Sequence, residues 1–312
     1  MNEQIEMIKR FEGLLSAPFT AFFQNGKVNV DIIPKYVDLL CTNNVRGAFV
    51  NGTTGEGPSL TMEERKLTAE KWIIAGKGKL DLIVTQVGGC NINDAKELAR
   101  HAEQHGATAI ASLPPLYYKP TENRDLISYL AAIASAAPNT PFLYYHIPSY
   151  TGINVKLDQF LCEAKLRIPT LCGAKYTSTD LRDLFLCQQL EGKPFKLFLG
   201  ADEIMLAALP LGVTAAIGAT YNFMAPLSHK VIQAYKTCDF SEARQEQGRI
   251  LKVVEVILKQ GPLISMIKAV MNNIGPLDFG NPRPPLQPAS EQEVTAMMKE
   301  LRALKLENLV QE

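Results

Sequence analysis

The 312-residue sequence has little excess charge of either sign and no long apolar run. Its 32 basic side chains balance 32 acidic ones, so the positive surface typical of a nucleic-acid-binding protein is not expected. No segment approaches the roughly 18 apolar residues of a membrane span, which argues against a membrane partner. The start, MNEQIEMIKRFEG, lacks the basic-then-apolar layout of a secretory signal. We therefore expect a cytoplasmic protein.

Cysteine is sparse, and no two cysteines form a C-x-x-C pair. The six are Cys41, Cys90, Cys162, Cys172, Cys187 and Cys238. This distribution excludes the disulfide framework of a small secreted protein. We expect reduced thiols that act as small buried apolar residues.

Histidine is also rare, with four in the chain. His101 and His105 lie four residues apart in ELARHAEQHG, a helical spacing that can bind a metal. The segment is not an H-E-x-x-H motif, and no third ligand is evident nearby. We favour a solvated helix face here and expect no metal site.

Short apolar runs recur along the chain, and each is followed by a helical pattern. The candidate strands begin near Leu14, Gly47, Leu82, Ala109, Phe142, Thr170, Lys196 and Ala215. Near-continuous apolar runs, rather than alternation, are typical of parallel strands covered by helices. Eight such units predict an α/β fold of the closed (β/α)₈ TIM-barrel type rather than an open sheet.

Several helix starts are readable. Thr61 with Glu64, and Ser290 with Glu293, have the spacing of a capping box. Asn93 is a candidate cap in NINDAKELARHA, and a Ser or Thr is expected to cap the helix in TSTDLRDLFL.

After residue 222 the strand–helix rhythm stops. We expect the barrel over 1–222 and a helical extension over 223–312 packed on it, with two or three helices between about 223 and 273. The Pro-rich stretch GPLDFGNPRPPLQPAS follows. Because it carries Leu277, Phe279 and Leu286, we favour an ordered connector over a polyproline II ligand motif.

Polar residues at the carboxyl ends of barrel strands are the place to look for chemistry. Lys175 lies in the apolar run LCGAKYT. A buried lysine favours the neutral amine, which can attack a carbonyl and form a Schiff base. The alternative is a lysine that pairs with a carboxylate or extends past the strand end. Tyr145 is either a general acid/base or a core aromatic beside Phe142 and Tyr144.

The loop at residues 52–57, GTTGEG, combines glycines with Thr53 and Thr54. Backbone N–H groups and hydroxyls in such a turn suit a small carboxylate, while the alternative is a tight turn before a helix. It is not a P-loop, because the lysine of that motif is missing. We interpret Glu56 as a structural partner of nearby backbone N–H groups.

Two further pairs are ambiguous from sequence. Asp202 and Glu203 could hold sugar hydroxyls or cap the next helix. Tyr117 and Tyr118 could line a pocket, lie at a subunit interface or pack within their loop.

Four segments together resemble a known family: NGTTGEGPSL, YYHIPSYTG, GAKYTSTD and LGADE. The chain resembles the N-acetylneuraminate lyases, within the larger group that includes dihydrodipicolinate synthase, from LLSAPFTAF to NPRPPLQPAS. The YYHIP segment together with the Asp-Glu pair looks like the animal-type lyases.

The resemblance implies a Schiff-base aldolase that cleaves N-acetylneuraminate to N-acetylmannosamine and pyruvate. It implies Lys175 as the Schiff-base lysine and Tyr145 as the proton donor and acceptor. Thr53 and Thr54 would hold the keto-acid carboxylate. The sugar would contact Thr177, Gly200, Asp202 and Glu203. The resemblance further implies a homotetramer without metal or organic cofactor, in which Tyr117 lies near a neighbour's site.

Two positions depart from patterns in the group. Ala219 stands where the lyases usually have the serine of GSTYN, and losing that hydrogen bond would cost about 0.5–1.5 kcal/mol of binding. Tyr150 stands where the synthases usually have an arginine, which argues against a synthase. Two alternatives stay open: an aldolase for another 2-keto-3-deoxy sugar acid, and a catalytically idle sensor of sialic or keto acids.

Overall fold

The computed structural model describes residues 2–304 and contains a closed barrel of parallel strands. In chain order the strands are β1 (Gly13–Ser16), β2 (Gly47–Val50), β3 (Leu82–Gln86), β4 (Ala109–Ser112), β5 (Phe142–His146), β6 (Leu171–Tyr176), β7 (Lys196–Leu199) and β8 (Ala215–Gly218). Each strand pairs with the next, and β8 pairs with β1. The predicted (β/α)₈ barrel is confirmed.

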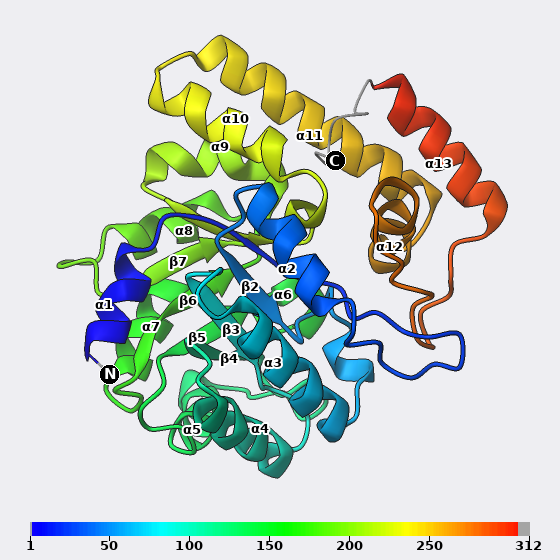
Figure 1. Cartoon of the computed structure of the whole chain (residues 1–312). Coiled ribbons are helices and arrows are strands. Elements are labelled where there is room, and N and C mark those ends of the chain that lie inside the picture. Colours follow the sequence, from blue (N-terminus) through cyan, green and yellow to red (C-terminus); the bar gives the residue numbers. More distant parts are fainter. Residues whose placement is uncertain (1, 305–312) are drawn as a thin grey trace.

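Helices surround this barrel (Figure 1). The α-helices are α1 (Asn2–Arg10), α2 (Ile33–Thr42), α3 (Met62–Gly76), α4 (Ile92–His105), α5 (Asn123–Ala134), α6 (Pro148–Thr151), α7 (Leu157–Lys165), α8 (Leu181–Gln188), α9 (Met205–Ala208), α10 (Ala225–Lys236), α11 (Phe240–Gln260), α12 (Leu263–Ile274) and α13 (Glu291–Ala303). Short 3₁₀ helices are η1 (Gly57–Ser59), η2 (Asp202–Ile204), η3 (Leu209–Leu211) and η4 (Thr220–Asn222).

Alternation along each strand divides the apolar side chains into two layers. One cluster fills the barrel interior and includes Leu15, Phe49 and Phe198. Neighbours such as Leu14 and Val50 join the larger cluster between the strands and the helices. Because parallel strands are covered on both faces, both sets of residues must be apolar. A polar residue pointing inward is therefore conspicuous.

The two predicted capping boxes are present. Thr61 caps α3 and Ser290 caps α13, each by a reciprocal hydrogen-bond pair with the glutamate three residues later. An N-cap of this kind stabilises a helix by about 1 kcal/mol.

The other two cap predictions were wrong. Asn91, not Asn93, caps α4, and its side-chain oxygen accepts from the Asn93 N–H at 2.9 Å. In α8 the cap is Asp180, whose Oδ1 accepts from the backbone N–H of Arg182 and Asp183 at 3.0 Å each. A carboxylate at a helix N-terminus also interacts favourably with the helix dipole, an advantage over Ser or Thr.

Helices α10, α11 and α12 confirm the expected helical run after β8. The described part of the Pro-rich connector is ordered against the barrel, with Phe279 buried between Phe19 and Tyr36. Arg283 adds a salt bridge to Glu64 of α3 at 2.5 Å. The interpretation as a wrapping connector is confirmed, whereas the division at residues 222 and 223 stays a prediction.

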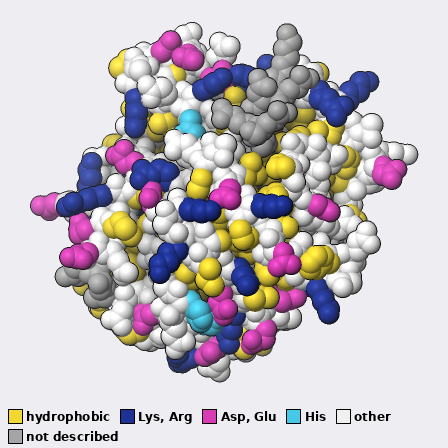
Figure 2. Space-filling model, in the orientation of Figure 1, with side chains coloured by type: hydrophobic (Ala, Val, Ile, Leu, Met, Phe, Trp, Pro, Cys, Tyr) yellow, Lys and Arg dark blue, Asp and Glu magenta, His cyan; other side chains and the backbone are white. Residues whose placement is uncertain are grey.

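The surface carries charges of both signs. Figure 2 shows acidic and basic side chains interspersed over one face. Among residues 2–304, no helix combines the length and the apolar character needed to cross a membrane.

Cys172 and Cys187 are buried free thiols as expected. The same expectation was wrong for the other four, which are exposed: Cys41, Cys90, Cys162 and Cys238.

Candidate active site

Strand register brings Lys175 and Tyr145 together. The two residues are direct partners across the parallel pair β5–β6, and on the other side Lys175 is paired with Phe198 of β7. Side chains at paired positions point to the same face of a sheet, which here is the barrel interior. The Lys175 Nζ lies 4.4 Å from the ring centroid of Tyr145 and 4.3 Å from that of Phe49.

Lys175 is buried, with 4% of its surface exposed. Burial lowers its pKa to about 7, and the negative charge of Asp202 opposes this shift. No salt bridge within the described residues involves Lys175. The sequence alternatives of a carboxylate pair and of a solvent-exposed ammonium therefore do not hold for this lysine. With this pKa a large fraction of Lys175 is neutral at physiological pH. The neutral amine is the form that attacks a carbonyl carbon.

Tyr145 is buried next to this amine. Its hydroxyl lies 3.1 Å from Thr53 Oγ1, within hydrogen-bond distance. Burial raises the pKa of Tyr145 to about 12, with the Thr53 hydroxyl opposing the rise. Tyr145 therefore begins as a neutral phenol that has a proton to donate. It is part of the apolar interior, as the core-aromatic interpretation held, and its hydroxyl contacts the GTTGEG loop. The general acid/base role stays a prediction.

The GTTGEG loop turns sharply at the end of β2. Glu56 has a positive φ of 54°, and Gly57 packs so closely on the Asn51 carbonyl that a Cβ would clash with it. This crowding requires glycine at that position. Thr54 is buried beside the partly exposed Thr53. The loop is thus a tight turn, as one interpretation held, and it presents a threonine hydroxyl to Tyr145.

Glu56 fixes this loop to the C-terminal helices. Its Oε1 accepts from Lys268 Nζ of α12 at 2.8 Å, and its Oε2 accepts from the backbone N–H of Arg283 at 2.8 Å. Both side chains of the ion pair are buried. The predicted partnership of Glu56 with a backbone N–H is confirmed, and the structure adds the lysine.

The ends of β6, β7 and β8 bring the remaining polar groups together. Asp202 is buried, accepts a hydrogen bond from the Thr220 hydroxyl and leaves Oδ1 without a partner in the described chain. Burial raises the pKa of this carboxyl. Glu203 is exposed, and neither carboxylate caps a helix. The capping alternative was therefore wrong.

Thr177 and Gly200 are packed against each other. A Cβ at Gly200 would clash with Thr177 Oγ1, so the glycine leaves space for that hydroxyl. Thr177 Oγ1 is buried and close enough to Tyr145 to lower its pKa, yet no hydrogen bond of normal geometry satisfies it within residues 2–304. Buried hydroxyls are rarely left unsatisfied, so this one is available to a ligand.

Tyr117 lies apart from this group. It is 78% exposed, and its ring packs edge-on against Tyr118 at 5.1 Å in the segment after β4. The interpretation that these tyrosines pack into their own loop is wrong, because both rings project into solvent apart from their mutual contact.

Comparisons with known proteins show which family the chain belongs to. A model of the dihydrodipicolinate synthetase family matches residues 10–304. The chain belongs to the dihydrodipicolinate synthetase family. It is 39% identical to the N-acetylneuraminate lyase of Gallus gallus over 95% of this chain and 97% of that protein. The lyase of Rattus norvegicus is 41% identical over 92% and 90% of the two chains.

The solved structure of the N-acetylneuraminate lyase from Proteus mirabilis superposes on this chain with a TM-score of 0.91. It is 33% identical, and the match covers 95% of this chain and 99% of that one. The lyase from Aliivibrio salmonicida also gives 0.91, at 34% identity over 96% and 98%. The resemblance to N-acetylneuraminate lyases, including those of animals, is confirmed.

Sequence reasoning missed three supports of this family site. Phe49 forms one wall beside Lys175, Lys268 anchors Glu56, and Gln247 of α11 donates to the carbonyls of Asp202 and Glu203 at 3.1 and 3.0 Å. Phe49 lies three residues before the GTTGEG loop, in the apolar run of the same strand, and this position was a usable signal. The other two lie far along the chain, and no local pattern marks them.

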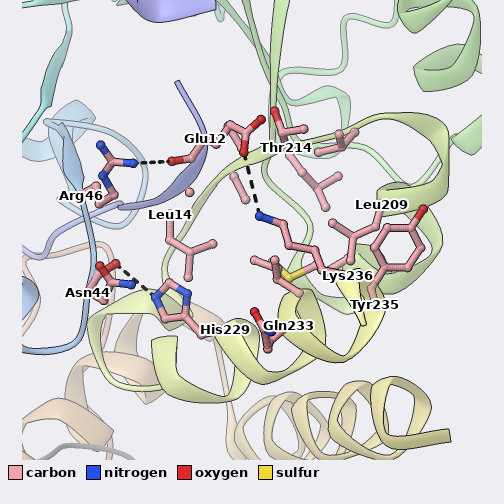
Figure 3. Close-up of a pocket in the computed structure, with 17 residues that line it drawn as sticks. Glu12, Leu14, Asn44, Arg46, Leu209, Thr214, His229, Gln233, Tyr235 and Lys236 are labelled. Atoms are coloured by element: carbon pink, nitrogen blue, oxygen red, sulfur yellow. Dashed lines mark hydrogen bonds and ion pairs between the residues drawn. The ribbon is translucent and has the colours of Figure 1, made fainter. Parts of the chain in front are cut away.

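A separate cavity of about 470 Å³ lies away from Lys175, against the starts of β1 and β8. Figure 3 shows Lys236 directed toward Glu12 and His229 toward Asn44. In a (β/α)₈ barrel the amino-terminal end of the strands serves stability, whereas the active site lies at the carboxyl end.

The histidines of α4 differ from expectation. His101 is 9% exposed, and its Nε2 lies 2.7 Å from Oε1 of Glu70 on α3. The expectation of a solvated face was wrong for His101, because α3 covers it. Glu70 is also a third potential metal ligand, which was not evident from the sequence because it lies 31 residues before His101.

Proposed function

We propose that the protein is a Schiff-base aldolase that cleaves N-acetylneuraminate to N-acetylmannosamine and pyruvate. The observation that carries the proposal is the state of Lys175, which is buried, forms no salt bridge among the described residues and has a pKa of about 7. It lies beside the ring of Tyr145. Similarity to N-acetylneuraminate lyases over nearly the whole chain supports the choice of substrate.

In the first half of the reaction, the neutral Lys175 amine adds to the C2 ketone of the open-chain sugar. Tyr145 donates its phenolic proton to the C2 oxygen, which leaves as water when the iminium forms. The raised pKa of Tyr145 fits this role, because the residue starts with its proton. The step leaves a phenolate next to the cationic iminium, and each charge stabilises the other in the buried interior.

In the second half, the Tyr145 phenolate takes the proton of the C4 hydroxyl. The C3–C4 bond breaks, its electron pair moves toward the iminium, and N-acetylmannosamine leaves as the aldehyde. Tyr145 gives that proton to C3 of the remaining enamine, which becomes an iminium again. Water hydrolyses this iminium to pyruvate and the neutral Lys175 amine, and the proton released restores the Tyr145 phenol. Dividing one difficult cleavage into these steps is the advantage of covalent catalysis.

The positions of the polar groups support a proposal for the substrate contacts. Thr53 and Thr54 would hold the keto-acid carboxylate at the GTTGEG loop. The free Thr177 hydroxyl and the open Oδ1 of Asp202 would bind sugar hydroxyls, with Glu203 at the exposed end. Gly200 would act by leaving space for Thr177.

The assembly and the cellular location are part of the same proposal. The exposed Tyr117 and Tyr118 rings, at 78% and 86%, are large apolar groups that a neighbouring subunit of a homotetramer would cover. We place the protein in the cytoplasm, with no metal or organic cofactor in the reaction. Light scattering coupled to gel filtration, on the wild type and on Tyr117→Ser, tests the assembly.

Trapping with borohydride tests the chemistry. The protein is incubated with pyruvate, reduced, digested and mapped by mass spectrometry. A reduced pyruvyl adduct on Lys175 is the expected result, and the buried Lys268 serves as the internal control that stays unmodified. A folded protein without an adduct on Lys175 would overturn the aldolase. Cleavage rates on N-acetylneuraminate and on a 2-keto-3-deoxy sugar acid then decide the substrate.

A further inference from the structure

Helices α3 and α4 bring together three side chains that can bind a transition metal. Glu70 lies on α3, and His101 and His105 lie in the second half of α4. One ligand atom from each of the three lies within 4.8 Å of the other two. The neighbouring helices are seen side by side in Figure 1, and Figure 2 shows histidine next to acidic side chains at the surface over them.

We propose that Glu70, His101 and His105 form a zinc site that links α3 to α4. Two imidazole nitrogens and one carboxylate oxygen are a ligand set that zinc favours, with a water in the fourth position. Mg²⁺ and Ca²⁺ prefer oxygen ligands, so the two histidines discriminate against them. The site is built from residues outside the lysine-centred cluster and is independent of the proposed aldolase.

His105 is already oriented for this role. Its Nδ1 lies 2.8 Å from the backbone carbonyl oxygen of His101. A carbonyl only accepts, so Nδ1 carries the proton and Nε2 presents its lone pair. That Nε2 lies 3.6 Å from Oε1 of Glu70. A ligating histidine ordinarily donates its other N–H to a carbonyl or a carboxylate, which fixes the tautomer and the ring orientation.

His101 supplies the second nitrogen. Its Nε2 lies 2.7 Å from Oε1 of Glu70, so zinc would take the place of the proton in that hydrogen bond while the ring keeps a proton on Nδ1. The His101 and His105 ring centroids are 4.1 Å apart. Zinc–nitrogen and zinc–oxygen bonds of about 2.0–2.2 Å fit between ligand atoms at these separations after small side-chain rotations.

The exposure of the three residues provides access. The His105 side chain is 40% exposed and the Glu70 side chain 33%, whereas His101 is 11% exposed. Zinc can therefore enter from solvent and find one ligand already held in place by packing. A metal that binds only the folded chain stabilises it in proportion to its occupancy.

Titration calorimetry with zinc chloride tests the proposal on the untagged full-length protein after EDTA treatment, and we expect one zinc per chain. Thermal unfolding should show a rise in melting temperature with zinc and no such rise with Mg²⁺. His105→Gln and Glu70→Gln should each weaken zinc binding at least about tenfold. His105→Gln alters the most exposed ligand, so the fold is retained. Glu63 is an exposed glutamate on α3, the helix that carries Glu70. Glu63→Gln is therefore the matched control and should bind zinc like the wild type.

Cobalt adds a second readout, because a tetrahedral Co²⁺ complex absorbs visible light and His105→Gln should abolish the band. Absence of zinc binding by the wild type would overturn the proposal. So would binding that both variants retain, for example binding removed only by alkylating the exposed cysteines.

Discussion

Three lysines are buried among residues 2–304: Lys175, Lys196 and Lys268. Two of them, Lys175 and Lys268, have similar aromatic surroundings. Lys175 Nζ lies 4.3 Å from the Phe49 ring centroid, and Lys268 Nζ lies 4.3 Å from that of Phe22. The difference is the carboxylate. Lys268 is bonded to Glu56 and to the Thr20 carbonyl at 2.8 Å each, whereas Lys175 has no such partner among the described residues.

This difference gives the two lysines different roles, a structural one for Lys268 and a proposed chemical one for Lys175. Burial lowers the pKa of both lysines, but the adjacent Glu56 opposes the shift at Lys268. A paired ammonium with its protons in hydrogen bonds is a poor nucleophile, and it holds two distant segments together. An unpaired lysine gains no such compensation, so burial favours its neutral and nucleophilic form.

The largest expected effect comes from removing the unpaired lysine. Lys175→Ala should lower lyase turnover by more than about a thousandfold, because the covalent route requires the amine. It should leave the melting temperature nearly unchanged or higher, since no ion pair is lost. Steady-state assays with N-acetylneuraminate and thermal unfolding measure the two. Appreciable residual cleavage, or an unfolded variant, would contradict the distinction between the lysines.

Removing the paired lysine should affect stability instead. Lys268→Met leaves Glu56 buried without its cation and should lower the free energy of unfolding by about 3–5 kcal/mol. The double variant Glu56→Gln, Lys268→Met should recover much of this loss, because no buried charge remains. Urea unfolding curves of the wild type, of the single variants Glu56→Gln and Lys268→Met and of the double variant give the coupling free energy. Additive losses would show that the pair does not act as a unit.

The pH dependence of adduct formation should report the Lys175 pKa of about 7. Below this pH the amine is protonated and unreactive, so the single-turnover rate of borohydride-trapped adduct formation should rise about tenfold from pH 6 to pH 8 and then level off. A rate that keeps rising tenfold per unit beyond pH 8.5 would indicate an ordinary lysine.

The smallest effect concerns the aromatic walls. The Phe49 ring stabilises the ammonium form of Lys175 by about 0.5–1 kcal/mol. Phe49→Leu should therefore move the midpoint of the pH profile to lower pH by roughly half a unit. Phe22→Leu, which removes the corresponding ring from Lys268, is the control and should leave the midpoint in place. Equal shifts in both variants would argue for a general change in packing.

Much of the barrel was predictable because local patterns carry it. A fully buried parallel strand needs a nearly continuous apolar run, and all eight runs lie at strands of the structure. The β6 run illustrates the precision, since its start was expected at Thr170 and lies at Leu171. Capping boxes succeeded for the same reason, because both partners lie within one turn. Caps at Asn91 and Asp180 were missed because several polar residues compete at each helix start.

The sequence by itself determined that a lysine and a tyrosine lie inside apolar runs at the carboxyl ends of parallel strands, because strand periodicity is a local property. Only the tertiary structure decided which lysine is free and which is paired. Glu56 and Lys268 are separated by 212 residues, and Glu70 is 31 residues from His101. Register, burial and long-range partners set the pKa of a side chain, and they exist only once the barrel has closed and its helices have packed.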